Sequence, residues 1–320
     1  MDIRQFFLKS HIFIITGKGG TGKTVSSLAL AKLASEQGLK TLLVTLETDS
    51  HIFSFFEIED PPINSSLEVH NNLSLRLITP EEALLEYLLE HGLGKISRKL
   101  ISTNTIDVIA NAIPGIQEIL VLGRLKRFER DRLADVIILD APATGHAVTL
   151  LTSPAGLTFA ARGGALKKQA DEVDEMLKDH SRCQVILVTI PEETPVNEVI
   201  DAAYAVEEKT DVALGPMIIN QMYTNLEGLD INPIEASLEA GAPAIDTKTE
   251  ALLLQANRFR MGKIEAQNEL LKKLDEKIAL PKIYLPLISE ENLGQDFIAL
   301  LSKEIGAQIA SMYDFEIDNP

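Results

Sequence analysis

The octapeptide GKGGTGKT at residues 17–24 constrains this chain more than any other feature of its sequence, because it directly follows the apolar run 12–15. Glycines let the backbone curl until successive N–H groups point at one anion, and a helix that begins there adds the positive end of its dipole. The spacing G-x-x-x-x-G-K-[ST] between a strand and a helix predicts a loop that wraps nucleotide phosphates. Its residues are Gly17, Gly19, Gly20, Thr21, Gly22, Lys23, Thr24 and Val25.

Two side chains of this loop are predicted to act on the nucleotide directly. Lys23 is expected to lie against the β- and γ-phosphates, and Thr24 is expected to ligate magnesium. The sequence therefore predicts a nucleotide with Mg²⁺ as ligands, and the resemblance given below implies that the nucleotide is ATP or ADP. A glycine-rich turn beside an ordinary helix is the alternative, and the agreement of strand, loop and helix weighs against it.

Apolar runs separated by glycine or proline alternate with longer amphipathic stretches along the rest of the chain. This alternation is typical of an α/β fold in which helices cover both faces of a mostly parallel sheet. Five of the runs are almost wholly apolar, as buried parallel strands are. We predict strands at 12–16, 40–46, 73–78, 135–140, 184–190, 212–219 and 282–286, and helices at 23–37, 81–91, 147–152, 195–209, 246–278 and 293–313.

Two stretches, 80–132 and about 153–182, are too long to be simple connections. Both favour helix, are interrupted by glycine or proline, and flank the strand that ends at Asp140. They would leave the sheet on the same side. We therefore predict a single domain over residues 1–320 that carries a helical subdomain built from these two insertions.

The charge and the cysteine content limit the partners that this chain can have. With 30 basic and 47 acidic residues the formal net charge is −17, which disfavours nonspecific attraction to nucleic acid or to an anionic membrane. One cysteine, Cys183, excludes an internal disulfide framework. No apolar stretch approaches the roughly 20 residues that span a bilayer. We expect a cytoplasmic protein with no nucleic-acid partner and no stable membrane insertion.

A second lysine, Lys18, distinguishes the loop from its usual form. The stretch K-G-G-T-G-K-T resembles the deviant Walker A motif of the MinD, ParA and arsenite pump-driving ATPases, which are P-loop NTPases. The resemblance implies a homodimer in which Lys18 crosses the interface and stabilises charge on the partner's nucleotide, as an arginine finger does. A solvent-exposed lysine that adds only diffuse positive potential is the alternative.

An aspartate, Asp140, ends the buried strand VIILD and begins the segment DAPATGH. An aspartate at the end of a strand beside a phosphate loop is the Walker B arrangement, which holds magnesium directly or through water. The segment resembles the D-T-A-P-T-G-H of arsenite pump-driving and tail-anchored-protein targeting ATPases, and MinD and ParA proteins lack its ending. The resemblance makes 140–146, with Thr144, Gly145 and His146, a switch that couples loss of the γ-phosphate to helix movement. A hydrogen-bonded histidine at a helix start is the alternative for His146.

Acidic residues also follow the predicted strand 40–46, in the sequence LETDSH. Related ATPases place there the loop that senses the γ-phosphate, so the resemblance makes Glu47, Asp49 and His51 another candidate switch, which we call the first because it precedes 140–146 in the chain. Asp49 is the candidate for orienting the attacking water. The usual Asp-Pro-Ala-His of the family is absent, which leaves the efficiency of hydrolysis open. Carboxylates that merely cap a loop are the alternative.

The base of the nucleotide is assigned by resemblance. Asn220, in the sequence IINQMY, matches the position at which the family reads the adenine edge, and an amide can both donate and accept there. Pro286 and Leu287 match the loop that covers adenine. A strand-end asparagine that starts a turn is an equally good interpretation of Asn220.

The resemblance fails at the cysteines. Metalloid-transporting relatives bind arsenite through several thiolates, which Cys183 alone does not provide, and the C-x-x-C zinc clasp of many targeting relatives is absent. The sequence therefore predicts a Mg²⁺-dependent ATPase that acts as a nucleotide-gated homodimer on an unknown client protein. The alternative is a nucleotide-responsive adaptor, or a chaperone that targets hydrophobic segments, with weak hydrolysis.

Overall fold

The computed structural model describes most of the chain, namely residues 3–48, 51–58, 65–96, 115–160, 163–225, 233–239, 241, 245–288 and 294–318. Its centre is a sheet with the strand order β3-β4-β2-β5-β1-β6-β8-β9, and β7 also pairs with β6. All pairings are parallel except that of β3 with β4. The strands are β1 (Ile12–Gly17), β2 (Thr41–Thr45), β3 (Leu67–His70), β4 (Leu73–Leu77), β5 (Val136–Asp140), β6 (Cys183–Thr189), β7 (Ala213–Leu214), β8 (Met217–Met222) and β9 (Lys282–Pro286).

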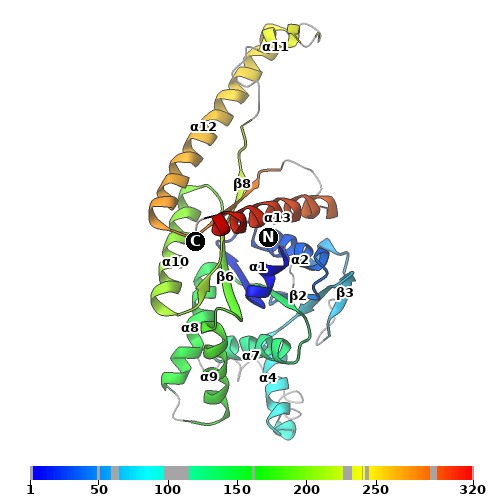
Figure 1. Cartoon of the computed structure of the whole chain (residues 1–320), viewed down its shortest axis with the longest axis vertical. Coiled ribbons are helices and arrows are strands. Elements are labelled where there is room, and N and C mark those ends of the chain that lie inside the picture. Colours follow the sequence, from blue (N-terminus) through cyan, green and yellow to red (C-terminus); the bar gives the residue numbers. More distant parts are fainter. Residues whose placement is uncertain are drawn as a thin grey trace.

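Helices cover both faces of this sheet, so the predicted α/β fold is confirmed (Figure 1). They are α1 (Arg4–Lys9), α2 (Lys23–Glu36), α3 (His51–Phe55), α4 (Pro80–Glu90), α7 (Ile116–Arg130), α8 (Thr144–Ala160), α9 (Ala165–Lys178), α10 (Glu193–Lys209), α11 (Pro233–Glu239), α12 (Thr247–Lys277) and α13 (Gln295–Asp318).

The central strand β1 shows why the sheet needs both layers. Its side chains alternate between the two faces, and every residue of the strand is buried. Ile12 and Ile14 belong to a core shared with α4, α7, α8, α9 and α10. Phe13 and Ile15 belong to a second core shared with α1, α2 and α13. A strand that is apolar on both faces is stable only between two layers of helices.

The helices of the two long insertions pack on one another and on the sheet. Helix α7 contacts α4, α8 and α9, and all four helices contribute to the core that contains Ile12 and Ile14. The second insertion was predicted from about residue 153, but α8 continues through Pro154 to Ala160. The division of the domain into a sheet and a helical subdomain stays a prediction.

Two strand predictions were incomplete. Strand β3 was missed; it forms an antiparallel hairpin with β4 through Asn71 and Asn72, and Asn72 has a φ of 61°. Asparagine tolerates this left-handed conformation in a tight turn. The single strand predicted at 212–219 is divided into β7 and β8 by Gly215 and Pro216, because proline has no N–H to donate to the ladder.

Helix α12 extends far from the rest of the molecule and carries α11 at its outer end (Figure 1). Of its 31 residues, three are buried, namely Ile264, Gln267 and Leu274. The predicted boundaries, 246–278, are correct to within one residue at each end. Among the helices of the described part of the chain, none has the length and apolarity needed to cross a membrane.

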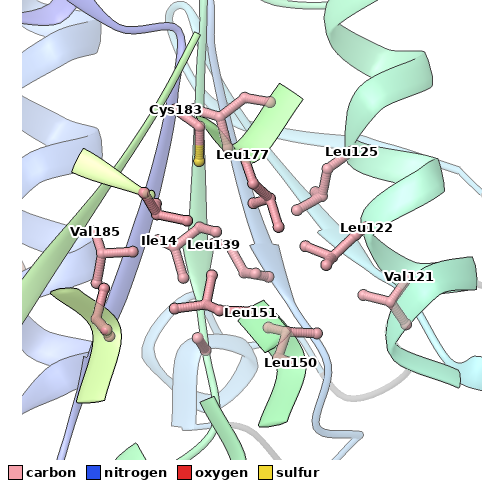
Figure 2. Packing of buried hydrophobic residues seen from close by; sticks show 14 of the residues in the cluster. Ile14, Val121, Leu122, Leu125, Leu139, Leu150, Leu151, Leu177, Cys183 and Val185 are labelled. Atoms are coloured by element: carbon pink, nitrogen blue, oxygen red, sulfur yellow. The ribbon is translucent and has the colours of Figure 1, made fainter. Parts of the chain in front are cut away.

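Cys183 lies in the core between the sheet and the insertion helices. Figure 2 shows it among aliphatic side chains of β1, β5, β6, α7, α8 and α9. Burial raises the pKa of its thiol to about 12, and the nearby Glu129 carboxylate adds to this effect. The thiolate, which is the reactive form, is therefore not populated at neutral pH.

We expect Cys183 to be unreactive toward Ellman's reagent in the folded protein at pH 8, and to react fully once guanidinium unfolds the chain. The absorbance of the released thionitrobenzoate measures both states. Rapid, stoichiometric reaction of the native protein would contradict the buried position.

Candidate functional site

The predicted site residues that the structure describes gather at one edge of the sheet. Because the strands that carry them are parallel, their carboxyl ends meet at the same edge, which is where α/β proteins bind ligands. Strand β1 leads there into the glycine loop, β2 into the first switch (47–51), β5 into the second switch (140–146), and β8 carries Asn220. The fold therefore brings together segments that are more than 200 residues apart.

Two positions of the loop require glycine for different reasons. A Cβ atom on Gly17 would lie 2.0 Å from the carbonyl oxygen of Val188 on the adjacent strand β6. Gly22 has a φ of 89°, and a Cβ atom there would lie 2.2 Å from the Asn220 amide nitrogen. The first glycine permits close strand pairing, and the second permits a left-handed turn directly before α2.

The loop is closed by bonds to a single carbonyl group, that of Lys18. The Thr21 hydroxyl donates to it at 2.8 Å, and the Lys23 ammonium donates to it at 3.3 Å. On the outer side, a Cβ atom at Gly19 or Gly20 would meet no atom of the described residues within 4 Å. The loop therefore presents bare backbone to solvent, with the Lys23 ammonium at its side, as the phosphate-binding hypothesis requires.

Asp140 lies directly behind the loop and accepts two hydrogen bonds from α2. The Thr24 hydroxyl donates to Oδ2 at 2.8 Å, and the Ser27 hydroxyl donates to Oδ1 at 3.0 Å. Burial raises the pKa of Asp140 to about 6, and these two hydrogen bonds and the Lys23 ammonium only partly oppose it. Ser27 was not predicted as a site residue. Its position three residues after Thr24 places it on the same face of a helix, and this spacing could have indicated it.

The donor set fits a magnesium ion. Thr24 and Asp140 offer hard oxygen ligands, which Mg²⁺ prefers, and in nucleotide sites the phosphates and water complete its coordination. A buried carboxylate with a raised pKa also gains from a neighbouring dication, which favours its charged form. The described residues contain no group of three or more histidine, cysteine, aspartate or glutamate side chains that could hold a metal ion.

The second switch is fixed at its start and runs into a helix at its end. The Thr16 hydroxyl of β1 donates to the carbonyl of Pro142 at 2.8 Å. Helix α8 begins at Thr144, which is buried, whereas Gly145 and His146 are exposed. A displacement of this segment would therefore act on α8, which packs on α7, α9 and α10.

The first switch is described only in part. Glu47 is exposed, and His51 is exposed at the start of α3. Asp49, the candidate for orienting water, lies outside the described residues. Burial is the main cause of the raised pKa of Asp140, and the Glu47 carboxylate adds to it. The candidate first switch therefore lies within electrostatic reach of Asp140, the candidate metal ligand.

Asn220 connects the glycine loop to the end of the site that is predicted to bind the nucleotide base. Its side chain is buried, and its amide nitrogen donates to the carbonyl oxygen of Thr21 at 3.1 Å. Its predicted contact with adenine stays a prediction, and the bond to the loop is an additional role. Pro286 ends β9, and the N–H of Leu287 donates to the carbonyl of Met222 at 2.8 Å.

A cavity of about 660 Å³ lies at this end of the site, between the carboxyl end of β8 and α12. Its lining includes Gln221 and Leu287, the chain neighbours of Asn220 and Pro286, and Tyr223. Gln267 of α12 fixes Tyr223 through both backbone groups, accepting from its N–H at 2.9 Å and donating to its carbonyl at 3.0 Å. The cavity has room for a nucleobase beside the predicted adenine contacts.

Lys18 is held by a residue that the sequence did not indicate. Its ammonium lies 2.5 Å from the Oε1 atom of Glu198 on α10, and the two side chains are 34% and 41% exposed. The two residues are 180 positions apart, and no local pattern marks Glu198 as part of the site.

Comparisons with known proteins agree with this geometry. Residues 10–162 match the sequence profile of a family described as anion-transporting ATPase. ATPase BagA of Mycobacterium tuberculosis (strain ATCC 25618 / H37Rv) is 28% identical over 305 residues, which cover 88% of each chain. The arsenical pump-driving ATPase of Escherichia coli is 28% identical over 198 residues, which cover 58% of this chain and 30% of that protein. These matches identify the chain as an ATPase of the P-loop type that resembles the anion-transporting, arsenical pump-driving ATPases.

Proposed function

We propose that this protein hydrolyses ATP with Mg²⁺ as a homodimer that ATP brings together, and that it transmits the state of the nucleotide to a client protein. The carrying observation is the glycine loop with its two lysines above the hydrogen-bonded cluster of Thr24, Ser27 and Asp140. In this arrangement Lys23 binds the phosphates of its own subunit. Thr24 and Asp140 hold the magnesium ion, which neutralises charge on the phosphates.

Lys18 is assigned to the partner's nucleotide. It lies in the same loop as Lys23, but its ammonium points to α10 rather than to the carbonyl that Lys23 contacts. A cation supplied from a second subunit stabilises the charge that develops during phosphoryl transfer. Dimerisation would then be a condition for rapid hydrolysis.

The output of the cycle is a movement of helices. Loss of the γ-phosphate would release Asp140 and the segment that follows it, and α8 begins within that segment. Helix α8 packs on α7, α9 and α10, so its displacement would reshape the face formed by the insertion helices. We place the client on that face.

The client is inferred not to be a soft metalloid. Arsenite is bound by several thiolates, and the single cysteine of this chain is buried in the core. The relatives named for arsenical pumps therefore have ATPase activity in common with this protein. We propose that they act on a different client. We keep a cytoplasmic location as part of the proposal.

Lys18→Ala tests the assignment of that lysine. We expect affinity for a fluorescent ATP analogue to stay within about twofold of wild type, because the phosphates of the same subunit are bound by Lys23 and the backbone. ATP-dependent dimerisation should weaken, and steady-state phosphate release should fall by about 1,000-fold or more, as for loss of an arginine finger.

The matched control is Lys168→Ala, which removes a lysine that is 80% exposed on α9. It should leave all three measurements unchanged. Nucleotide titration, analytical ultracentrifugation and phosphate release together decide the result. Lys18→Ala that loses nucleotide affinity as severely as Lys23→Ala would show that Lys18 serves its own subunit and would sink the proposal.

A further inference from the structure

The ion pair between Lys18 and Glu198 occupies the lysine that the proposed dimer needs. The Nζ and Oε1 atoms are 2.5 Å apart, which is a short charge-assisted hydrogen bond. For Lys18 to bind the partner's nucleotide as proposed, its ammonium has to exchange the Glu198 carboxylate for the phosphates. Dimer formation therefore requires that the pair be broken.

Glu198 is placed by a rigid part of the fold. Strand β6 pairs with β1 up to Gly17, and α10 begins four residues after β6 ends. On the same helix, Val196 and Val199 are buried, and Asn197 accepts a hydrogen bond from Lys273 of α12 at 2.6 Å. The carboxylate is thus presented on a fixed helix beside the loop.

We propose that Glu198 is a positioning residue that holds Lys18 within its own subunit until two ATP-loaded subunits meet. This inference rests on the proposed function, since it assumes the role of Lys18 across the interface. Glu198 itself would touch neither nucleotide. Its role is to set how strongly a competing anion must attract Lys18 before the lysine leaves Glu198.

The ion pair is weak enough for a nucleoside triphosphate to displace Glu198 from Lys18. A half-exposed ion pair changes an equilibrium constant by a factor of about two to five, because solvent screens it. A triphosphate carries several negative charges and offers the ammonium a stronger site than one carboxylate does. The γ-phosphate can therefore displace Glu198, and without it the lysine is expected to stay in its own subunit. The pair would thus help the dimer to distinguish ATP from ADP.

The test is Glu198→Gln, which removes the charge and keeps the size of the side chain. In ATP, the dissociation constant of the dimer should fall by about four- to 25-fold, because each of the two subunits no longer gives up an ion pair. In ADP, dimers should become detectable at lower protein concentrations than for wild type. Glu198→Asp keeps the charge on a shorter side chain and should give an intermediate value.

The control is Glu208→Gln, which neutralises an exposed carboxylate about three turns further along α10. It should leave the dissociation constant unchanged. Analytical ultracentrifugation gives the dimer constants, and affinity of the monomer for a fluorescent nucleotide should be equal in all variants. An unchanged or weaker dimer in Glu198→Gln, with native thermal stability, would overturn the inference.

The double variant Lys18→Ala/Glu198→Gln separates this inference from the function on which it rests. If Glu198 acts through Lys18, its substitution should have no effect when Lys18 is absent. If Lys18→Ala weakens the dimer while Glu198→Gln does not strengthen it, the holding role is wrong and the proposed function stands. If neither single variant changes the dimer, the role of Lys18 across the interface is itself wrong.

Discussion

Lys23→Ala should weaken the binding of both ATP and ADP by about 10- to 150-fold, since a hydrogen bond to a charged group contributes about 1.5–3 kcal/mol. The Lys23 ammonium lies at the side of the loop and already contacts its backbone, at the carbonyl of Lys18. The loop itself therefore helps to position this ammonium. Titration of a fluorescent nucleotide measures the change, and hydrolysis should fall with it at subsaturating ATP.

Lys32→Ala is the matched control, because Lys32 lies on the same helix α2 and pairs with Glu36 at 2.9 Å, away from the loop. It should bind nucleotide as wild type does. Circular dichroism and thermal unfolding check that both variants are folded. Near-wild-type affinity of Lys23→Ala in a folded protein would rule out the loop as the phosphate site.

The segment from β1 to α2 could be predicted from the sequence to within one residue, because every signal that defines it is local. The apolar run specifies a strand buried on both faces, and the glycines at 17 and 22 are needed by backbone geometry within the loop and the adjacent strand. The loop then leads directly into α2 at Lys23. Asp140 could be predicted for the same reason, because its position at the end of an apolar strand predicts a carboxylate at the edge of the sheet.

The pairings that complete the site could not be predicted, because they depend on which segments the fold brings together. Glu198 is one carboxylate among 47 acidic residues, and only the packing of α10 beside the loop selects it. Gln267 fixes Tyr223 from a helix that begins more than twenty residues after it. Neither interaction leaves a periodicity or a spacing in the sequence.

Asn220 has one predicted contact from the family resemblance and a different contact in the structure. The resemblance assigns its amide to adenine, whereas the described contact joins β8 to the loop at Thr21. Its chain neighbour Gln221 lines the cavity beside α12, so the bond to Thr21 connects the loop to the strand end that borders this cavity. Long-range contacts of this kind decide how the parts of a site act together, and local sequence patterns do not encode them.

Asp140→Asn should have two opposite effects, and the structure explains both. Hydrolysis should fall by roughly 100- to 1,000-fold, because an amide replaces the charged oxygen that favours magnesium. The metal-free protein should become more stable by about 1–2 kcal/mol above pH 6. Burial is the main cause of the raised pKa of Asp140, about 6 against an ordinary 3.8, and a shift of this size corresponds to about 3 kcal/mol, of which a neutral amide recovers part.

The pH dependence gives the sign of this effect. A carboxyl group with a raised pKa in the folded state stabilises the fold below about pH 4, where it is protonated, and this contribution is lost as the pH rises through about 6. The advantage of Asp140→Asn should therefore appear above pH 6 and vanish below pH 4. Urea unfolding with a chelator, from pH 4 to pH 8, measures it.

Asp135→Asn provides the control, since Asp135 is exposed beside the opposite end of the same strand, where it accepts from the N–H of Lys40 at 2.8 Å. That variant should keep its hydrolysis. If Asp140→Asn were destabilising at every pH, the carboxylate would be a net support of the fold rather than a group that burial disfavours. If it were more stable and still hydrolysed ATP at the wild-type rate, Asp140 would not be the metal aspartate. We expect Asp140→Asn to be more stable and to lose catalysis. This combination would mean that the carboxylate is kept for magnesium binding although its burial destabilises the fold.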